Sequence, residues 1–244
     1  MEKDEARRRT QATTSSFSLF PSSLLHSLWL RLAVHMGALV PLAQLLWDGT
    51  HHQLTVNPIQ EITVRTGKTA LVLLVLTLAC TPVSTVLGWK PALLVRRTLG
   101  LYAFFYASLH FLTFTVLDYG LDWALIQQAI VEKRFVLAGF AAFLALVPLA
   151  LTSTKGWMRR LGKHWKRLHR LVYVAALLAI VHYVWLVKAD VRKPLLYGAI
   201  VVALLALRLP QVRRALVRAR YRLARRPRRA RAAPLGAELL RRHY

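Results

Sequence analysis

One stretch near the end of the chain constrains the fold more than any other. Residues 165–188 form an apolar segment long enough to cross a bilayer, entered through a basic cluster and left through an aromatic and lysine end. The segment contains His169 and His182. Ionisable side chains are costly in hydrocarbon and mark candidate functional positions, and a neutral imidazole can ligate haem iron. We therefore expect the other spans to hold this helix against a second helix that bears a histidine.

Composition places the chain among membrane proteins. Its 244 residues are 56% hydrophobic, yet its formal net charge is +25. Apolar spans joined by basic loops combine these two properties. A charge this high can also mark a nucleic-acid-binding surface, but here the basic residues flank apolar spans, so membrane lipid and not nucleic acid is the expected contact. The single cysteine, Cys80, excludes a disulfide framework, a thiolate zinc site and an iron–sulfur cluster.

The apolar runs predict an all-α fold, a polytopic bundle of six transmembrane helices in residues 24–209. Residues 1–23 are polar and are expected to be disordered, and residues 210–244 form a basic tail. The tail is expected to bind anionic lipid, and a docking patch for an acidic partner is the alternative. The bias of Lys and Arg in the short loops predicts that both termini are cytoplasmic. The expected spans are residues 24–47, 69–87, 98–117, 135–151, 165–188 and 195–209.

Two histidines are expected at the same depth in the membrane. His110 lies about seven residues before the outer end of span 98–117, and His182 lies about five residues before that of span 165–188. At about 1.5 Å per residue, their depths agree within roughly 3 Å. Two such imidazoles could ligate one haem on both faces, and the iron would then transfer electrons without an open position for substrate. Alternatively, each histidine only hydrogen-bonds a neighbouring helix, and the sequence pattern favours neither reading.

His169 suggests a second site nearer the cytoplasmic end. It precedes His182 by 13 residues, or about 20 Å along a helix, and the two share a face only if the helix is kinked. The corresponding positions, just before span 98–117, are occupied by Arg96 and Arg97. Arginine cannot ligate iron but can pair with a haem propionate or a flavin phosphate. This inner site is therefore expected to hold a haem with another second ligand, a different anionic cofactor or a quinone.

Several short runs are more distinctive than a scatter of apolar residues. They are Asn57-Pro58, Thr66-Gly67, Leu99-Gly100-Leu101-Tyr102, Ser108-Leu109-His110, Leu151-Thr152-Ser153-Thr154, Arg160-Leu161-Gly162-Lys163, Trp165-Lys166-Arg167-Leu168-His169 and His182-Tyr183-Val184-Trp185-Leu186-Val187-Lys188. In this order, over residues 28–209, they resemble the MsrQ (YedZ) family of the ferric-reductase-like transmembrane superfamily. Members of that family are haem-binding partners of the periplasmic molybdenum methionine sulfoxide reductase MsrP.

The resemblance implies an electron-transfer subunit in the bacterial inner membrane that binds haem b and FMN. His110, His169 and His182 fall on the family's haem-associated histidines, with the iron as their metal. Arg96 and Arg97 stand where two-haem ferric reductases have a further histidine, which leaves the number of haems open. Electrons would come from the quinone pool or a cytosolic flavin reductase. They would pass to MsrP, which carries out the sulfoxide reduction and repairs oxidised proteins, so no catalytic residue is expected in this chain.

Two other functions remain open from the sequence. No G-x-G-x-x-G or P-loop motif occurs, and the residues after 209 are few and basic, so the chain is not expected to accept hydride from NAD(P)H by itself. A ferric or cupric reductase of the same superfamily would then need a flavin-domain partner. A non-redox transporter or scaffold is the third reading. It is weakened because we recognise no internal repeat in the sequence.

Overall fold

The computed structural model describes residues 22–187 and 189–218, which are almost entirely helical and contain no strand. The all-α class predicted from the sequence is confirmed. The predicted disordered segment at residues 1–23, apart from its last two residues, and the basic tail beyond residue 218 lie outside the described residues, as does Lys188.

The chain divides into two units, Met1–Gln53 and Leu54–Tyr244, which are described separately. The first unit contains α2 (Ser22–Thr50), a long apolar helix in which Ala38 is the one buried residue among the side chains that the structure describes. Its large apolar side chains, such as Trp29 and Leu32, are exposed, which suits a helix surrounded by lipid.

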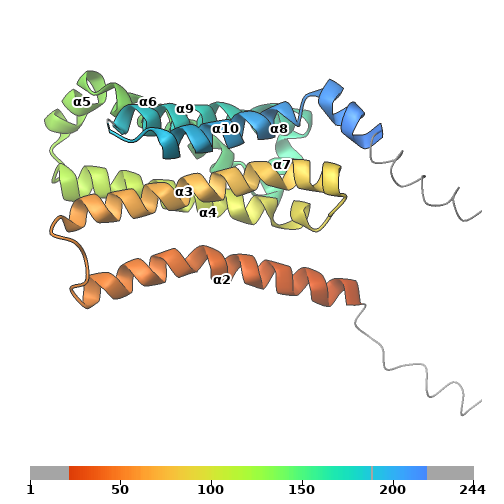
Figure 1. Cartoon of the computed structure of the whole chain (residues 1–244), viewed down its shortest axis with the longest axis horizontal. Coiled ribbons are helices and arrows are strands. Elements are labelled where there is room, and N and C mark those ends of the chain that lie inside the picture. The colour runs from red at the N-terminus through yellow and green to blue at the C-terminus, as the bar shows by residue number, and fades with distance from the viewer. Residues whose placement is uncertain (1–21, 188, 219–244) are drawn as a thin grey trace, which may run out of the picture. The chain divides into compact units, whose positions relative to one another are not determined.

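The second unit is built from two helical hairpins. α3 packs along α4, α6 packs along α9, and α10 lies against α9 and α3, so the helices form two layers (Figure 1). The buried faces are rich in alanine, which lets the helix backbones approach closely. The elements are α3 (Pro58–Pro82), η1 (Val83–Leu87), α4 (Ala92–Leu112), η2 (Thr113–Asp118), α5 (Trp123–Glu132), α6 (Arg134–Leu151), α7 (Lys155–Leu161), α8 (Lys163–Leu168), α9 (Leu171–Leu186) and α10 (Arg192–Ala206).

Five helical segments in the described residues are long and apolar enough to cross a membrane by themselves. A sixth span results if α10 is joined to the helical segment Pro210–Arg218, which follows a bend of 77°. The chain is thus a multi-pass membrane protein, as predicted, and its sixth span is the short and broken one. The five segments are Ser27–Thr50, Pro58–Leu87, Ala92–Asp118, Arg134–Leu151 and Lys163–Leu186.

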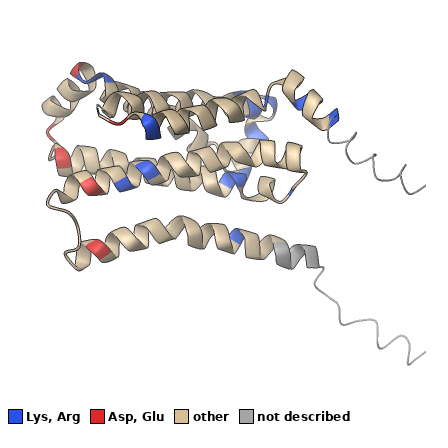
Figure 2. Ribbon diagram, viewed as in Figure 1, with Lys and Arg blue, Asp and Glu red and all other residues tan. Residues whose placement is uncertain are grey.

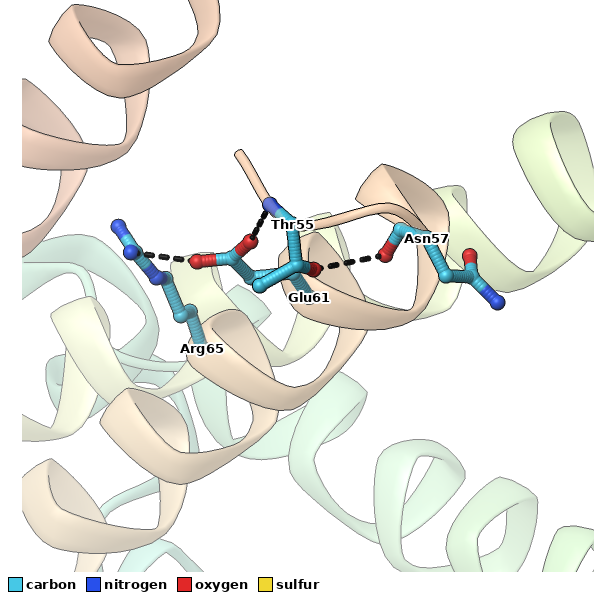
Figure 3. A network of polar contacts seen from close by, with 4 residues as sticks. All are labelled: Thr55, Asn57, Glu61 and Arg65. Carbon is cyan, nitrogen blue, oxygen red and sulfur yellow. Dashed lines mark hydrogen bonds and ion pairs between the residues drawn. The ribbon is translucent and has the colours of Figure 1, made fainter. Parts of the chain in front are cut away.

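The second span begins earlier than the sequence suggested. We expected residues 48–68 to form a polar loop, but α3 begins at Pro58 because Asn57 caps it: its side-chain oxygen accepts a hydrogen bond from the Gln60 amide at 3.1 Å. Glu61 binds the Thr55 amide at 2.6 Å and pairs with Arg65 one turn later (Figure 3). These polar residues lower the hydropathy of the first turns without preventing the helix.

The fifth span is interrupted. Residues 165–188 were expected to form one helix, but α8 ends at Leu168 and α9 begins at Leu171, with His169 and Arg170 in a turn between them. The expectation of a continuous helix is wrong at this point. The turn is an interruption of the kind considered for the spacing of His169 and His182, although the segment Lys163–Leu186 still forms a single span.

The two ends of the second unit differ in charge. We call the end with α5 the α5 end and the end with α7 and α8 the α7 end. In the described part of this unit every carboxylate side chain belongs to the α5 end, whereas the α7 end is basic (Figure 2). At the α5 end Lys133 donates a hydrogen bond to the Tyr119 hydroxyl at 2.8 Å, and this bond raises the pKa of Lys133. The carboxylates are Glu61, Asp118, Asp122, Glu132 and Asp190.

Candidate functional site

His110 and His182 face each other inside the second unit. They come from α4 and α9, helices of different hairpins, and their ring centroids lie 6.0 Å apart with the planes at 81°. A bond between a metal and an imidazole nitrogen is about 2.0 Å long, so two imidazoles on opposite sides of one metal have centroids roughly 6 Å apart. The residues that the sequence placed at equal depth are therefore at a separation that suits one iron atom.

Each of these imidazoles is held by a backbone carbonyl of the neighbouring helix. His110 Nδ1 lies 2.8 Å from the Thr63 oxygen in α3, and His182 Nδ1 lies 2.6 Å from the Phe135 oxygen in α6. A carbonyl only accepts, so Nδ1 carries the proton in both rings and Nε2 keeps its lone pair. The hydrogen bonds of the alternative reading are thus present. They also leave each Nε2 with a lone pair that could bind a metal.

Two glycines make room for the histidines. A Cβ at Gly67 would lie 2.9 Å from His110 Nδ1, and a Cβ at Gly139 would lie 2.6 Å from His182 Nδ1. These distances are too short for carbon, so only glycine lets each ring rest on the facing helix and reach the carbonyl one turn earlier. The sequence analysis quoted Thr66-Gly67 only as part of a resemblance and did not consider Gly139.

The two hairpins repeat the same arrangement. Carbonyl, glycine and histidine occur at Thr63, Gly67 and His110 in the first hairpin, and each has its counterpart 72 residues later in the second. The expectation that the sequence has no internal repeat is therefore wrong for these three positions. The repeated spacing was the signal that could have revealed both glycines.

Aromatic rings pack beside the paired histidines, between α4 and α6. The Phe111 ring stacks on Phe143 at 4.8 Å and on Phe140 at 5.9 Å, and Phe104 stacks on Phe143 at 5.8 Å between ring centroids. The Phe135 ring lies 6.2 Å from that of His182 between centroids, so aromatic side chains contribute to the surroundings of the pair.

A second site lies at the α7 end. A cavity of about 470 Å³ brings together His169, Arg96 and Arg97, the three residues that the sequence assigned to an inner site. Arg96 is half-buried and donates a hydrogen bond to the Thr81 hydroxyl at 3.2 Å, whereas Arg97 is exposed. The cavity also contains Arg208, which the sequence analysis did not single out. As an ionisable residue within the expected span 195–209, it met the criterion that had singled out the histidines.

His169 is fixed by Trp165. Its Nδ1 lies 3.1 Å from the Trp165 carbonyl oxygen, and the two rings lie 3.9 Å apart between centroids. The indole in turn donates a hydrogen bond to the Thr152 oxygen at 3.0 Å. His169 Nε2 is buried and makes no hydrogen bond of good geometry, although the Leu149 backbone lies near enough to interact with the ring.

The paired histidines fit a haem better than a bare metal ion. No group of three or more His, Cys, Asp or Glu side chains that could hold a metal ion occurs in the part of the chain that the structure describes. A haem supplies four equatorial nitrogens itself, so two axial imidazoles with free Nε2 atoms are sufficient. The donor set at His110 and His182 therefore fits a haem, and the basic cavity fits the acidic groups of a cofactor.

Comparison with known proteins agrees with this chemistry. Residues 66–180 match the family described as the ferric reductase like transmembrane component. The haem-binding subunit MsrQ of the protein-methionine-sulfoxide reductase of Xanthomonas euvesicatoria is 46% identical over 181 residues, covering 72% of this chain and 83% of the relative. The MsrQ of Rhodospirillum rubrum is 46% identical over 189 residues, covering 75% and 89% respectively. No solved structure matches the chain.

These similarities define the class first and the family second. The chain is a ferric-reductase-like transmembrane protein with a pair of partly buried histidines between two helical hairpins. It belongs to the MsrQ family.

Proposed function

We propose that this protein is the electron-transfer subunit of a methionine sulfoxide reductase system, with one haem b held by His110 and His182. The observation that carries the proposal is the pair of imidazoles 6.0 Å apart, each with Nδ1 bound to a carbonyl. A bound haem would supply one-electron chemistry at an iron that has no open position. Relatives are named as haem-binding subunits, which supports the same cofactor.

The protein's own residues prepare this site in two ways. The Thr63 and Phe135 carbonyls fix the tautomer and orientation of the histidines, so little reorganisation accompanies binding or a change of charge. Gly67 and Gly139 leave room for the rings against the helices, and stacked phenylalanines lie between α4 and α6. An apolar and preorganised environment of this kind would suit electron transfer.

We propose that the cavity at the α7 end binds FMN. Arg96 and Arg97 would pair with the phosphate, since a guanidinium matches its geometry and stays charged at all relevant pH values. The free Nε2 of His169 would face the same ligand. A haem with a different second ligand, or a quinone, is the alternative occupant of this cavity.

The charge of the two ends supports a proposal for the direction of electron flow. Because basic loops stay in the cytoplasm, we place the α7 end and both termini on the cytoplasmic side of the bacterial inner membrane, in contact with membrane lipid. Electrons would enter there from the quinone pool or a cytosolic flavin reductase. They would leave through the haem near the α5 end to the periplasmic subunit MsrP, which reduces methionine sulfoxide in oxidised proteins.

Single-turnover absorbance measurements on the purified full chain test this function. The reduced haem should be formed by a quinol or by a flavin reductase with NADH, and it should be reoxidised when the molybdenum subunit and methionine sulfoxide are added. Haem that is reduced but is reoxidised only by ferric or cupric salts would favour the second candidate, a metal reductase, which the ferric-reductase match supports. Protein that takes up no haem would favour a non-redox transporter or scaffold.

A further inference from the structure

The cavity at the α7 end contains an excess of positive charge. Five cationic side chains line it together with His169, and no carboxylate of the described residues lies among the lining residues. Cations in an apolar, partly enclosed cavity repel one another and are stabilised by a bound anion. The five are Arg96, Arg97, Lys166, Arg170 and Arg208.

Arg208 differs from the others because the fold holds its guanidinium in place from two sides. It follows α10, and its Nη1 donates a hydrogen bond to the Tyr173 hydroxyl of α9 at 2.8 Å. Its Nη2 donates to the Leu78 carbonyl oxygen of α3 at 2.6 Å, and its carbon Cζ lies 5.1 Å from the Tyr173 ring centroid. Both acceptors are neutral. The side chain is therefore fixed in position but its charge is not compensated.

Two buried polar atoms in the cavity have no partner. Of the side-chain nitrogen and oxygen atoms in the described residues, only Arg208 Nε and His169 Nε2 are both buried and without a hydrogen bond. Both residues line this one cavity. Because buried polar groups are almost always satisfied, two exceptions in the same place indicate a missing ligand, with an acceptor for Arg208 Nε and a separate donor group for the lone pair of His169 Nε2.

From these observations we propose that Arg208 is a third arginine of the inner site, which binds and positions the phosphate of the flavin mononucleotide. The inference rests on the proposed function, which assigns the flavin to this cavity. Arg208 Nε would donate to a phosphate oxygen while Tyr173 and Leu78 keep the two other nitrogens in place. The residue thus joins α3, α9 and the end of α10 around the ligand.

A phospholipid headgroup offers the same phosphate chemistry, so the test must separate the two sources. The full chain is reconstituted in phosphatidylcholine nanodiscs, stripped of flavin, and titrated with FMN and with riboflavin, which lacks the phosphate. Binding is followed by flavin fluorescence. The variants are Arg208→Gln, Arg208→Lys and the control Arg213→Gln, which removes an equal charge from an exposed position five residues later. Haem content reports the integrity of the other site.

Arg208→Gln should bind FMN at least about tenfold more weakly than the wild type, because a charge-assisted hydrogen bond to the phosphate is lost. Its affinity for riboflavin and its haem content should be unchanged. Arg208→Lys should have an intermediate affinity for FMN, because it keeps the positive charge but loses the planar guanidinium group with its several donors. Arg213→Gln should bind FMN like the wild type. Unchanged FMN binding in Arg208→Gln, or an equal loss of FMN and riboflavin, would overturn the assignment.

Two further outcomes distinguish this inference from the function on which it rests. A wild type that binds no flavin would refute the proposed flavin site itself, and the Arg208 assignment with it. The titration is also repeated with phosphatidylglycerol in the nanodiscs. If this anionic lipid weakens FMN binding in the wild type but not in Arg208→Gln, a lipid headgroup occupies the position and the assignment is wrong. An unchanged dissociation constant supports the flavin phosphate.

Discussion

Gly139 lies so close to His182 that a single added carbon would collide with the imidazole, 2.6 Å from Nδ1. The same nitrogen lies 2.6 Å from the Phe135 oxygen, so the ring is confined between a glycine and a carbonyl of α6. Gly67 and Thr63 confine His110 in the same way. The pair of histidines is therefore positioned by backbone, which leaves their Nε2 atoms available.

Gly139→Ala should displace His182 and lower the haem content to less than half of that in the wild type. The reason is steric: the ring must move away from α6, loses its hydrogen bond to Phe135 and no longer presents Nε2 to the iron. Haem per chain, determined by the pyridine haemochrome method after purification, checks this prediction.

Gly100→Ala is the matched control for that experiment. It adds the same methyl group to a helical glycine of the same unit, but the nearest atom, the Thr77 Cγ2, lies at an ordinary contact distance of 3.5 Å. This variant should keep its haem. Equal haem contents in Gly139→Ala and the wild type would show that the glycine is not needed for the histidine site.

Arg96→Gln should weaken FMN binding more than Arg97→Gln. Arg96 lies 14 residues before His110 in a continuous helix, so at about 100° per residue the two are only about 40° apart around the axis, and Arg96 is half-buried. Arg97 is rotated by roughly a further 100° and is exposed. Fluorescence titration with FMN compares the two variants, and the reverse order of affinities would contradict the account.

Asn57→Ala should lower stability without removing the haem. Loss of this cap leaves the Gln60 amide without its partner and costs about 1 kcal/mol, which corresponds to roughly 2–4 °C in melting temperature for a chain of this size. The temperature at which half of the Soret absorbance is lost measures the change. Gln60→Ala, which keeps the capped backbone, should melt like the wild type, and an equal shift in both would argue against the cap.

Much of the fold could be predicted because hydropathy reports on spans that contact lipid. The polar start of α3 could not, since Glu61, Arg65 and Lys68 lower the hydropathy of turns that are nevertheless helical. The first turns of α3 contain Thr63 and Gly67, which contact His110. The sequence therefore placed the residues that hold His110 in a loop. A capping asparagine followed by proline was the local signal for a helix at this point.

The sequence predicted which histidines would lie together but not the contacts that hold them there. The comparison of depths used only the position of each residue along its helix, and it was sufficient to predict that His110 and His182 lie close together. The glycines, by contrast, act through close contact between α3 and α4 and between α6 and α9, which no single segment reveals. The hydrogen bonds of Arg208 to Tyr173 and Leu78 likewise join elements that are distant in sequence.

The measurement that tests the central claim most directly is the haem content of His110→Ala and His182→Ala, with a reduced-minus-oxidised spectrum of each. His164→Ala serves as the control, because His164 is exposed at the α7 end and lies outside both sites. The wild type and the control should show a six-coordinate b-type spectrum near one haem per chain, and both test variants should lose most of it. Haem retained at the wild-type level in both variants would contradict the proposal that these two histidines hold it.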